Sequence, residues 1–344
     1  MTQLFGRSFT QQQLLSYVGD LSQAGGIRLA ELKDSKERSN RIAEVRSGAG
    51  LRYTVLLDRG MDIGLADFCG IPLAYVSPAG FAHPTFYEPH GLGWLYTFGS
   101  GLMLGCGLTF LGDPQIDQGE DFGLHGRLSH LPASKVNYGE TWQGDECIFW
   151  IEGQMRQVRV HGEYLSLNRR ISTVLGQNTI RIEDSVENRA DKPSPLMVMY
   201  HINTGFPLLT EHSYLQAVPH EIIPYDEESA ARIAEWNHYI PPAQTYLDQT
   251  FYHDIPPDEQ GWSKVELVSP DAGLTLTILQ KKEALPYLVQ WKKLEKGVYL
   301  MGLEPSNSYV AGRSYERTAG RLRMIQPGET RRFEIEISVS VINS

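Results

Sequence analysis

The stretch CIFWIEGQMRQVRVHGEYLSLNRRISTVLGQNTIRIEDSVENRA, residues 147–190, alternates apolar and polar side chains over most of its length. A period of two places the apolar side chains on one face of an extended strand and the polar ones on the other. Two breaks rich in turn residues, Gly162-Glu163 and Gly176-Gln177-Asn178, divide it at intervals of roughly 8–12 residues. The stretch therefore predicts at least three antiparallel strands that each cover a core with one face.

Strand signals continue on both sides of this stretch. Segment 52–77 holds two apolar runs separated by a polar corner, 264–280 is typical of a hairpin around Pro270–Gly273, and 331–342 alternates as a last strand. Segment 219–257, rich in Pro, Tyr and acidic residues, predicts irregular structure. Only residues 8–22, where Thr10 and Gln13 have the spacing of a capping box, predict a helix.

These signals favour an all-β fold, a large antiparallel β-sandwich with a short N-terminal helix. No linker rich in Pro, Gly or Ser divides the chain, so we expect a single domain over residues 1–344.

Composition limits the classes of partner. The net charge of −10 and the acidic pI disfavour nucleic acid and anionic membranes as main partners. Three widely spaced cysteines form no disulfide framework, and the first residues lack the apolar segment of a secretory signal. No apolar run is long enough to span a bilayer. We expect a soluble cytoplasmic protein, either a monomer or a homo-oligomer.

Two loops carry polar residues that could contact a ligand. In DFGLHGRLSHLPA (121–133), His125 and Arg127 flank a glycine, which would let the chain approach a ligand closely. An arginine offers a planar fork of donors to hydroxyl or carboxylate oxygens. The alternative is a surface loop in which His125 caps backbone groups. Arg59, in the Asp58-Arg59-Gly60 corner, has the same two interpretations: a ligand contact or a solvated turn.

Two apolar strands are interrupted by polar residues. In LMVMYHINTGFPLL (196–209), His201 and Asn203 are two residues apart and therefore share one face of a strand. The segment GVYLMGLEPSN (297–307) predicts a buried strand that ends at Glu304. A buried carboxylate is costly unless it is hydrogen-bonded or used in chemistry. A core histidine and a turn made by Pro305 are the structural alternatives.

Other chemistries have no support in the sequence. It contains no G-x-G-x-x-G after a strand, no phosphate-binding P-loop, no G-x-S-x-G elbow and no H-E-x-x-H. His125, His130 and His201 lack the spacing of metal ligands. We therefore expect neither a metal nor an organic cofactor.

Three motifs in order, LHGRLSHLPA (124–133), YHINTGFPLL (200–209) and GLEPSN (302–307), resemble the aldose 1-epimerase (galactose mutarotase-like) superfamily. LLDRGMDIG (56–64) and QWKK (290–293) resemble a poorly characterised bacterial branch of it. The resemblance implies a galactose mutarotase-like supersandwich, with His201 as general acid and Glu304 as general base. It also implies sugar contacts from His125 and Arg59. The Asn-His pair of the better-known members is replaced by YHINTGFP, and Asp248 is only a loose match for their sugar-binding aspartate.

The chemistry implied is interconversion of the anomers of a monosaccharide. Ring opening needs a base at the C1 hydroxyl and an acid at the ring oxygen, and no metal or nucleotide. An ionised Glu304 and a protonated His201 coexist most readily at mildly acid pH. Arg59 and Arg127 suggest that the sugar is acidic, with Asn203 as a further contact. Two alternatives remain: a non-catalytic carbohydrate-binding or sensing protein, and an isomerase or lyase acting elsewhere on a sugar.

Overall fold

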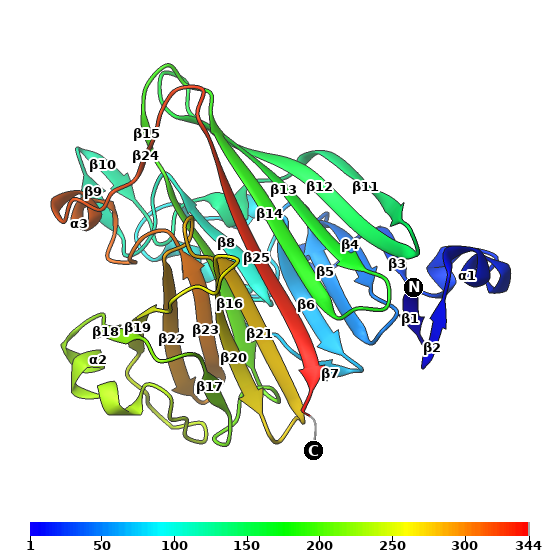
Figure 1. Ribbon diagram of the computed structural model, residues 1–344. Helices are drawn as coiled ribbons and strands as arrows, with labels where there is room; N and C mark the ends of the chain where they lie inside the picture. Colours follow the sequence, from blue (N-terminus) through cyan, green and yellow to red (C-terminus); the bar gives the residue numbers. More distant parts are fainter. Residues whose placement is uncertain (343–344) are drawn as a thin grey trace.

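Two large antiparallel sheets form the body of the protein (Figure 1). The computed structural model describes residues 1–342. The first sheet has eight strands in the spatial order β11 (Ser134–Gln143), β12 (Glu146–Val158), β13 (Tyr164–Val174), β14 (Thr179–Asn188), β25 (Thr330–Val341), β21 (Leu274–Lys281), β20 (Trp262–Ser269) and β17 (Tyr214–Gln216).

The second sheet has eleven strands and carries the residues of interest. Its order is β18 (Glu221–Pro224), β19 (Gln249–Asp254), β22 (Tyr287–Glu295), β23 (Val298–Ser306), β16 (Met197–Gly205), β8 (Met103–Leu108), β6 (Asp62–Phe68), β5 (Leu51–Leu56), β4 (Arg41–Arg46) and β3 (Gly26–Glu31), with β7 (Ile71–Pro72) beside β6. The small pairs are β1 (Thr2–Leu4) with β2 (Arg7–Phe9), β9 (Gln115–Asp117) with β10 (Glu120–Phe122), and β15 (Ser194–Pro195) with β24 (Met324–Ile325).

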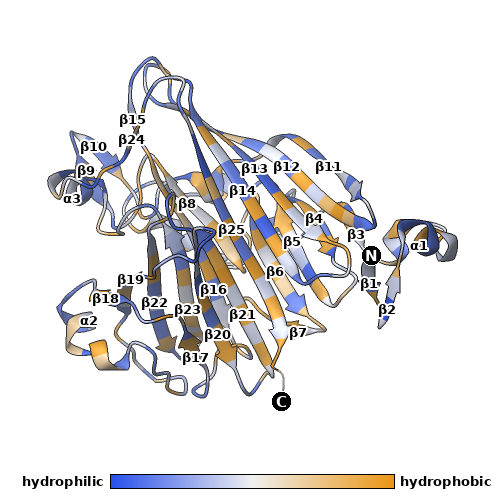
Figure 2. Cartoon of the chain, in the orientation of Figure 1, coloured by the Kyte–Doolittle hydropathy of each residue, from blue (hydrophilic) through white to orange (hydrophobic). Residues whose placement is uncertain are grey.

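The stretch 147–190 forms β12, β13 and β14, which pair in register as successive antiparallel neighbours. Along β14 every second side chain is buried, beginning with Ile180 and Ile182. Figure 2 shows this alternation as orange and blue bands across the sheet. The predicted hairpin around Pro270–Gly273 and the predicted last strand are also confirmed, as β20–β21 and β25.

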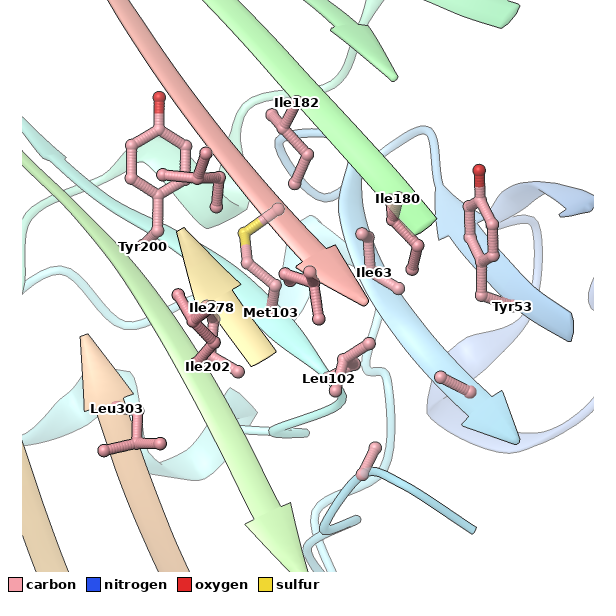
Figure 3. Packing of buried hydrophobic residues seen from close by; sticks show 14 of the residues in the cluster. Tyr53, Ile63, Leu102, Met103, Ile180, Ile182, Tyr200, Ile202, Ile278 and Leu303 are labelled. Atoms are coloured by element: carbon pink, nitrogen blue, oxygen red, sulfur yellow. The ribbon is translucent and has the colours of Figure 1, made fainter. Parts of the chain in front are cut away.

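The main core lies between the inner faces of the two sheets. Ile180, Ile182 and Ile278 of the eight-stranded sheet meet residues such as Ile202 and Leu303 of the eleven-stranded sheet (Figure 3). All five side chains are at most 1% exposed. Burial of this apolar surface is the main force that holds the sheets together.

Three predictions of local structure need correction. Helix α1 covers only Gln11–Tyr17: the capping box of Thr10 and Gln13 forms, but Val18 is already extended. Segment 219–257 is more regular than predicted, because it contains β18, α2 (Glu227–Ala231) and β19. Strand β23 does not end at Glu304 but continues to Ser306, with Pro305 opposite Leu288. The third α-helix is α3 (Arg313–Thr318), and no helix within residues 1–342 combines the length and apolar character needed to cross a membrane.

Candidate functional site

His201 and Glu304 lie side by side on two central strands of the eleven-stranded sheet. Strands β16 and β23 are antiparallel, with Ile202 opposite Leu303, so the residues on either side of this pair also face each other. Ile202 and Leu303 point into the main core. Their neighbours His201 and Glu304 therefore project from the opposite face of the sheet. His201 Nε2 lies 3.3 Å from Glu304 Oε1, and both side chains are almost completely buried.

His125 reaches the same place from the connection that follows β10. Its backbone has a φ of 56°, which is uncommon for a residue other than glycine. Two hydrogen bonds fix it: the His125 amide donates to the Gly112 carbonyl, and the Gly107 amide donates to the His125 carbonyl, both at 2.9 Å. The His125 and His201 ring centroids are 5.8 Å apart. Strain held by such bonds is typical of a functional position.

These three side chains line one cavity of about 340 Å³. Its apolar wall is made by Leu92, Trp94, Leu95, Phe98, Leu124, Val289, Trp291 and Val310. The remaining lining residues are Asp113, Tyr225, Asp226, Asp248 and Thr250. The cavity thus combines aromatic faces with carboxylates, and the buried pair lies in its lining.

Burial controls the charge of the pair. It raises the pKa of Glu304 well above its usual value and lowers the pKa of His201 well below its usual value. The neighbouring His125, whose own pKa burial lowers to about 4, further disfavours a charge on His201. The neutral forms of both side chains are therefore favoured, in contrast to the ionised Glu304 and protonated His201 expected from the sequence. In either charge state, neutral or ionised, Glu304 and His201 together hold one transferable proton.

This charge state predicts a pH-dependent gain of stability in Glu304→Gln. A carboxyl group whose pKa is raised by folding gives stability that is fully present below its unfolded pKa and is lost as pH rises toward its folded pKa. Glutamine has no such dependence. The free energy of unfolding of the variant should therefore exceed that of the natural protein by an amount that grows from about pH 4 upward, at up to ~1.4 kcal/mol per pH unit.

Urea unfolding at pH 4, 6 and 8 measures this difference. The exposed Glu259→Gln is the matched control, and its effect should change little with pH. A Glu304→Gln difference that is the same at all three pH values would contradict the neutral, buried carboxyl.

Several buried polar atoms of the residues that line the cavity make no well-aligned hydrogen bond within residues 1–342. They include Glu304 Oε1, His125 Nδ1 and His201 Nδ1, none of which makes a well-aligned hydrogen bond. A buried polar group without a partner is costly, and such groups are rare outside sites that use them.

The other three predicted contacts, Arg59, Arg127 and Asn203, do not line this cavity. Arg59 is 1% exposed and donates to the Ala82 carbonyl at 2.5 Å and the Thr97 carbonyl at 3.0 Å. Arg127 is exposed and lines a different cavity.

Asn203 is fully buried outside the cavity lining. Its amide donates at 3.0 Å to the His201 carbonyl. Its side chain also favours the charged form of His201, which partly opposes the effect of burial on the His201 pKa.

Two lining residues were missed or only loosely indicated by the sequence. Trp291 lies within the QWKK motif, and its indole Nε1 donates to Asp248 Oδ2 at 3.0 Å. Asp248 also pairs with Lys293 at 2.8 Å. Asp248 precedes β19, in the segment predicted to be irregular, where no alternation indicated a strand. The QWKK motif and the loose match at Asp248 were the signals for this wall.

Comparisons with known proteins support the fold. A family model described as "Domain of unknown function (DUF4432)" matches residues 37–339. No curated protein matches the sequence significantly. A Klebsiella pneumoniae structure described as a provisional aldose 1-epimerase is 25% identical, with a TM-score of 0.87 over 96% of this chain and 86% of its own.

Two more distant structures share the fold alone. A galactose mutarotase-like protein of Clostridium acetobutylicum is 10% identical, with a TM-score of 0.64 over 93% of this chain and 99% of its own. A galactose 1-epimerase of Lactobacillus acidophilus is 12% identical, with a TM-score of 0.58 over 92% and 99%. The predicted galactose mutarotase-like sandwich is confirmed.

Proposed function

Since the chain belongs to the DUF4432 family, whose description names no activity, we propose a function from its cavity: an aldose 1-epimerase-like isomerase that interconverts the anomers of a monosaccharide. The observation that carries the proposal is the buried contact of His201 Nε2 with Glu304 Oε1, 3.3 Å apart in the lining of a cavity. An acid and a base so placed suit a reaction that moves two protons.

The proposed reaction uses the single proton of the pair. A sugar hydroxyl that donates to Glu304 favours the carboxylate, and the proton then resides on His201. Glu304 removes the proton of the C1 hydroxyl, the O–H electron pair forms the carbonyl, and the bond from C1 to the ring oxygen breaks. His201 protonates the released ring oxygen. Rotation about the C1–C2 bond and the reverse steps close the ring on the other face.

The remaining residues have supporting roles in this proposal. His125 stays neutral over most of the pH range, because its pKa is near 4, so it can both donate and accept a sugar hydrogen bond. Asn203 supports the His201 strand and imidazole rather than the sugar. Arg59 holds the backbone at Thr97, next to the aromatic wall residue Phe98.

Size and charge favour an uncharged monosaccharide. Ligand cavities generally measure about 300–1,000 Å³, so about 340 Å³ suits a small ligand. The described lining contains the carboxyl groups of Asp113 and Asp226, besides the buried Glu304 and Asp248, which pairs with Lys293, and it contains neither lysine nor arginine. A sugar carboxylate or sulfonate would therefore meet the carboxyl groups of Asp113 and Asp226 and no cationic side chain in the lining. Arg59 and Arg127 no longer favour an acidic sugar, because neither lines the cavity.

Anomer-resolved proton NMR tests the proposal directly. Freshly dissolved pure anomers of neutral aldoses should equilibrate faster with the protein than in buffer, and at least one neutral sugar should react at least ~10-fold faster than the uronic acid of the same configuration. The spontaneous rate in buffer must be subtracted. Arg127→Ala is a matched control, because Arg127 lies outside the cavity, and it should leave the rates unchanged.

The same spectra separate the alternatives. Binding of a sugar without faster anomer exchange would support a carbohydrate-binding or sensing protein. New product signals would support an isomerase or lyase that acts elsewhere on the sugar. A uronic acid that reacts faster than every neutral aldose would contradict the charge argument.

A further inference from the structure

Gly302 occupies a gap in the row of side chains beside the acid–base pair. In the register of the sheet it lies between Asn203 of β16 and Trp291 of β22, two residues before Glu304 on the same strand. Residues two apart on a strand share a face, so a side chain at position 302 would project beside that of Glu304. We propose that Gly302 is a positioning residue, whose missing side chain leaves the space that holds the Glu304 carboxyl group against His201.

The space is occupied by the carboxyl group itself. A Cβ atom built on Gly302 would overlap Glu304 Oε1 and would lie 3.2 Å from Glu304 Cδ and 3.3 Å from His201 Cε1. The Glu304 side chain therefore leans along its own strand over the glycine, and there it meets the imidazole. Any side chain at position 302 would displace the carboxyl group.

The backbone does not explain the glycine. Its φ lies outside the left-handed range that favours glycine, and strand interiors are weakened by glycine because it adds backbone entropy and packs no side chain. Gly302 is absent from the cavity lining, so close approach of a ligand does not explain it either. The contact with the Glu304 carboxyl group remains as the reason for glycine here.

Substitution should therefore affect function more than folding. The group that must move is the end of a flexible side chain, and moving it costs little stability. Glu304 Oε1 has no well-aligned hydrogen bond within residues 1–342 that would pull it back. A displacement of about 1 Å at a reacting group is enough to slow a reaction substantially.

Gly302→Ala tests the inference, which rests on the proposed function. The variant should keep or slightly raise the melting temperature and lower kcat at least ~10-fold, with a smaller change in KM. Gly139→Ala is the matched control: it also lies within a strand, its added Cβ would only touch the Trp150 side chain at 3.4 Å, and kcat should be unchanged. A Gly302→Ala protein with full kcat overturns the proposal.

A double variant distinguishes action through Glu304 from other effects. If the alanine acts only by displacing the carboxyl group, adding Gly302→Ala to Glu304→Gln should cost less than a further ~2-fold in kcat. Losses that multiply in the double variant would show that position 302 acts on something else, and would overturn the positioning role.

A readout without turnover separates this inference from the proposed function. The NMR titration of the His201 Cε1 proton should differ between Gly302→Ala and the natural protein, because the nearest carboxyl group moves away from the imidazole. Gly139→Ala should show no such difference. A changed titration in a protein that turns over no sugar would support the positioning role and reject the function. An unchanged titration would overturn the positioning role whatever the activity.

Discussion

Glu304→Gln should lower kcat at least ~10²-fold on the best sugar of the NMR panel, the usual scale for loss of a general base. Glutamine keeps the size and shape of the side chain but cannot accept the C1 hydroxyl proton. The sugar should still bind, because the aromatic wall and His125 are unchanged, and KM should therefore change much less than kcat.

The control for this prediction is Glu259→Gln, an exposed carboxylate changed in the same way, which should leave kcat unaltered. Urea unfolding also tests whether Glu304→Gln is folded, since that variant is expected to be more stable than the natural protein above about pH 4. A Glu304→Gln protein with near-full turnover would reject Glu304 as the base.

The combination of lost activity and gained stability follows from where the carboxyl group lies. A buried carboxyl group without a well-aligned hydrogen bond on Oε1 costs folding free energy, and a glutamine at the same place avoids the ionisation cost. Proteins commonly retain such costs at functional positions. A carboxyl group kept only for structure would show the opposite result, because its loss would destabilise the fold.

The strands were predictable because their signal is local. Over much of residues 147–190 apolar side chains recur at every second position, and the buried positions of β14 follow that pattern. Strands β18 and β19 were missed because they are short or mix buried and exposed residues without alternation. Strand β16 is buried at every position, so periodicity could not show which of its side chains face the core.

The site was only partly predictable because it depends on pairing between distant strands. His201 and Glu304 were placed together by resemblance to a family, whereas the contact itself comes from the pairing of β16 with β23, which no spacing in the sequence encodes. Arg59 was predicted as a ligand contact or part of a solvated turn, and it is neither a cavity residue nor exposed. A polar corner in the sequence gave no sign that its guanidinium is buried against the Ala82 and Thr97 carbonyls. Gly302 opens the GLEPSN motif, but the motif gave no sign of its role, which depends on a neighbouring side chain.

His201→Asn should also lower kcat by ~10², because asparagine cannot protonate the ring oxygen. The double variant His201→Asn/Glu304→Gln should be little slower than the slower single variant, because a pair that shares one proton acts as a unit. All three proteins should be compared by NMR on the same sugar, at the same pH, after subtraction of the spontaneous rate.

Independent action of His201 and Glu304 would give a different result in the double variant. Losses that multiply, to ~10⁴ in the double variant, would mean that each residue contributes independently. The contact of 3.3 Å between His201 Nε2 and Glu304 Oε1 would then not be part of the reaction. Near-additive losses from two groups in direct contact are unexpected when one proton passes between them, so the double variant tests the shared proton and not merely the importance of each residue.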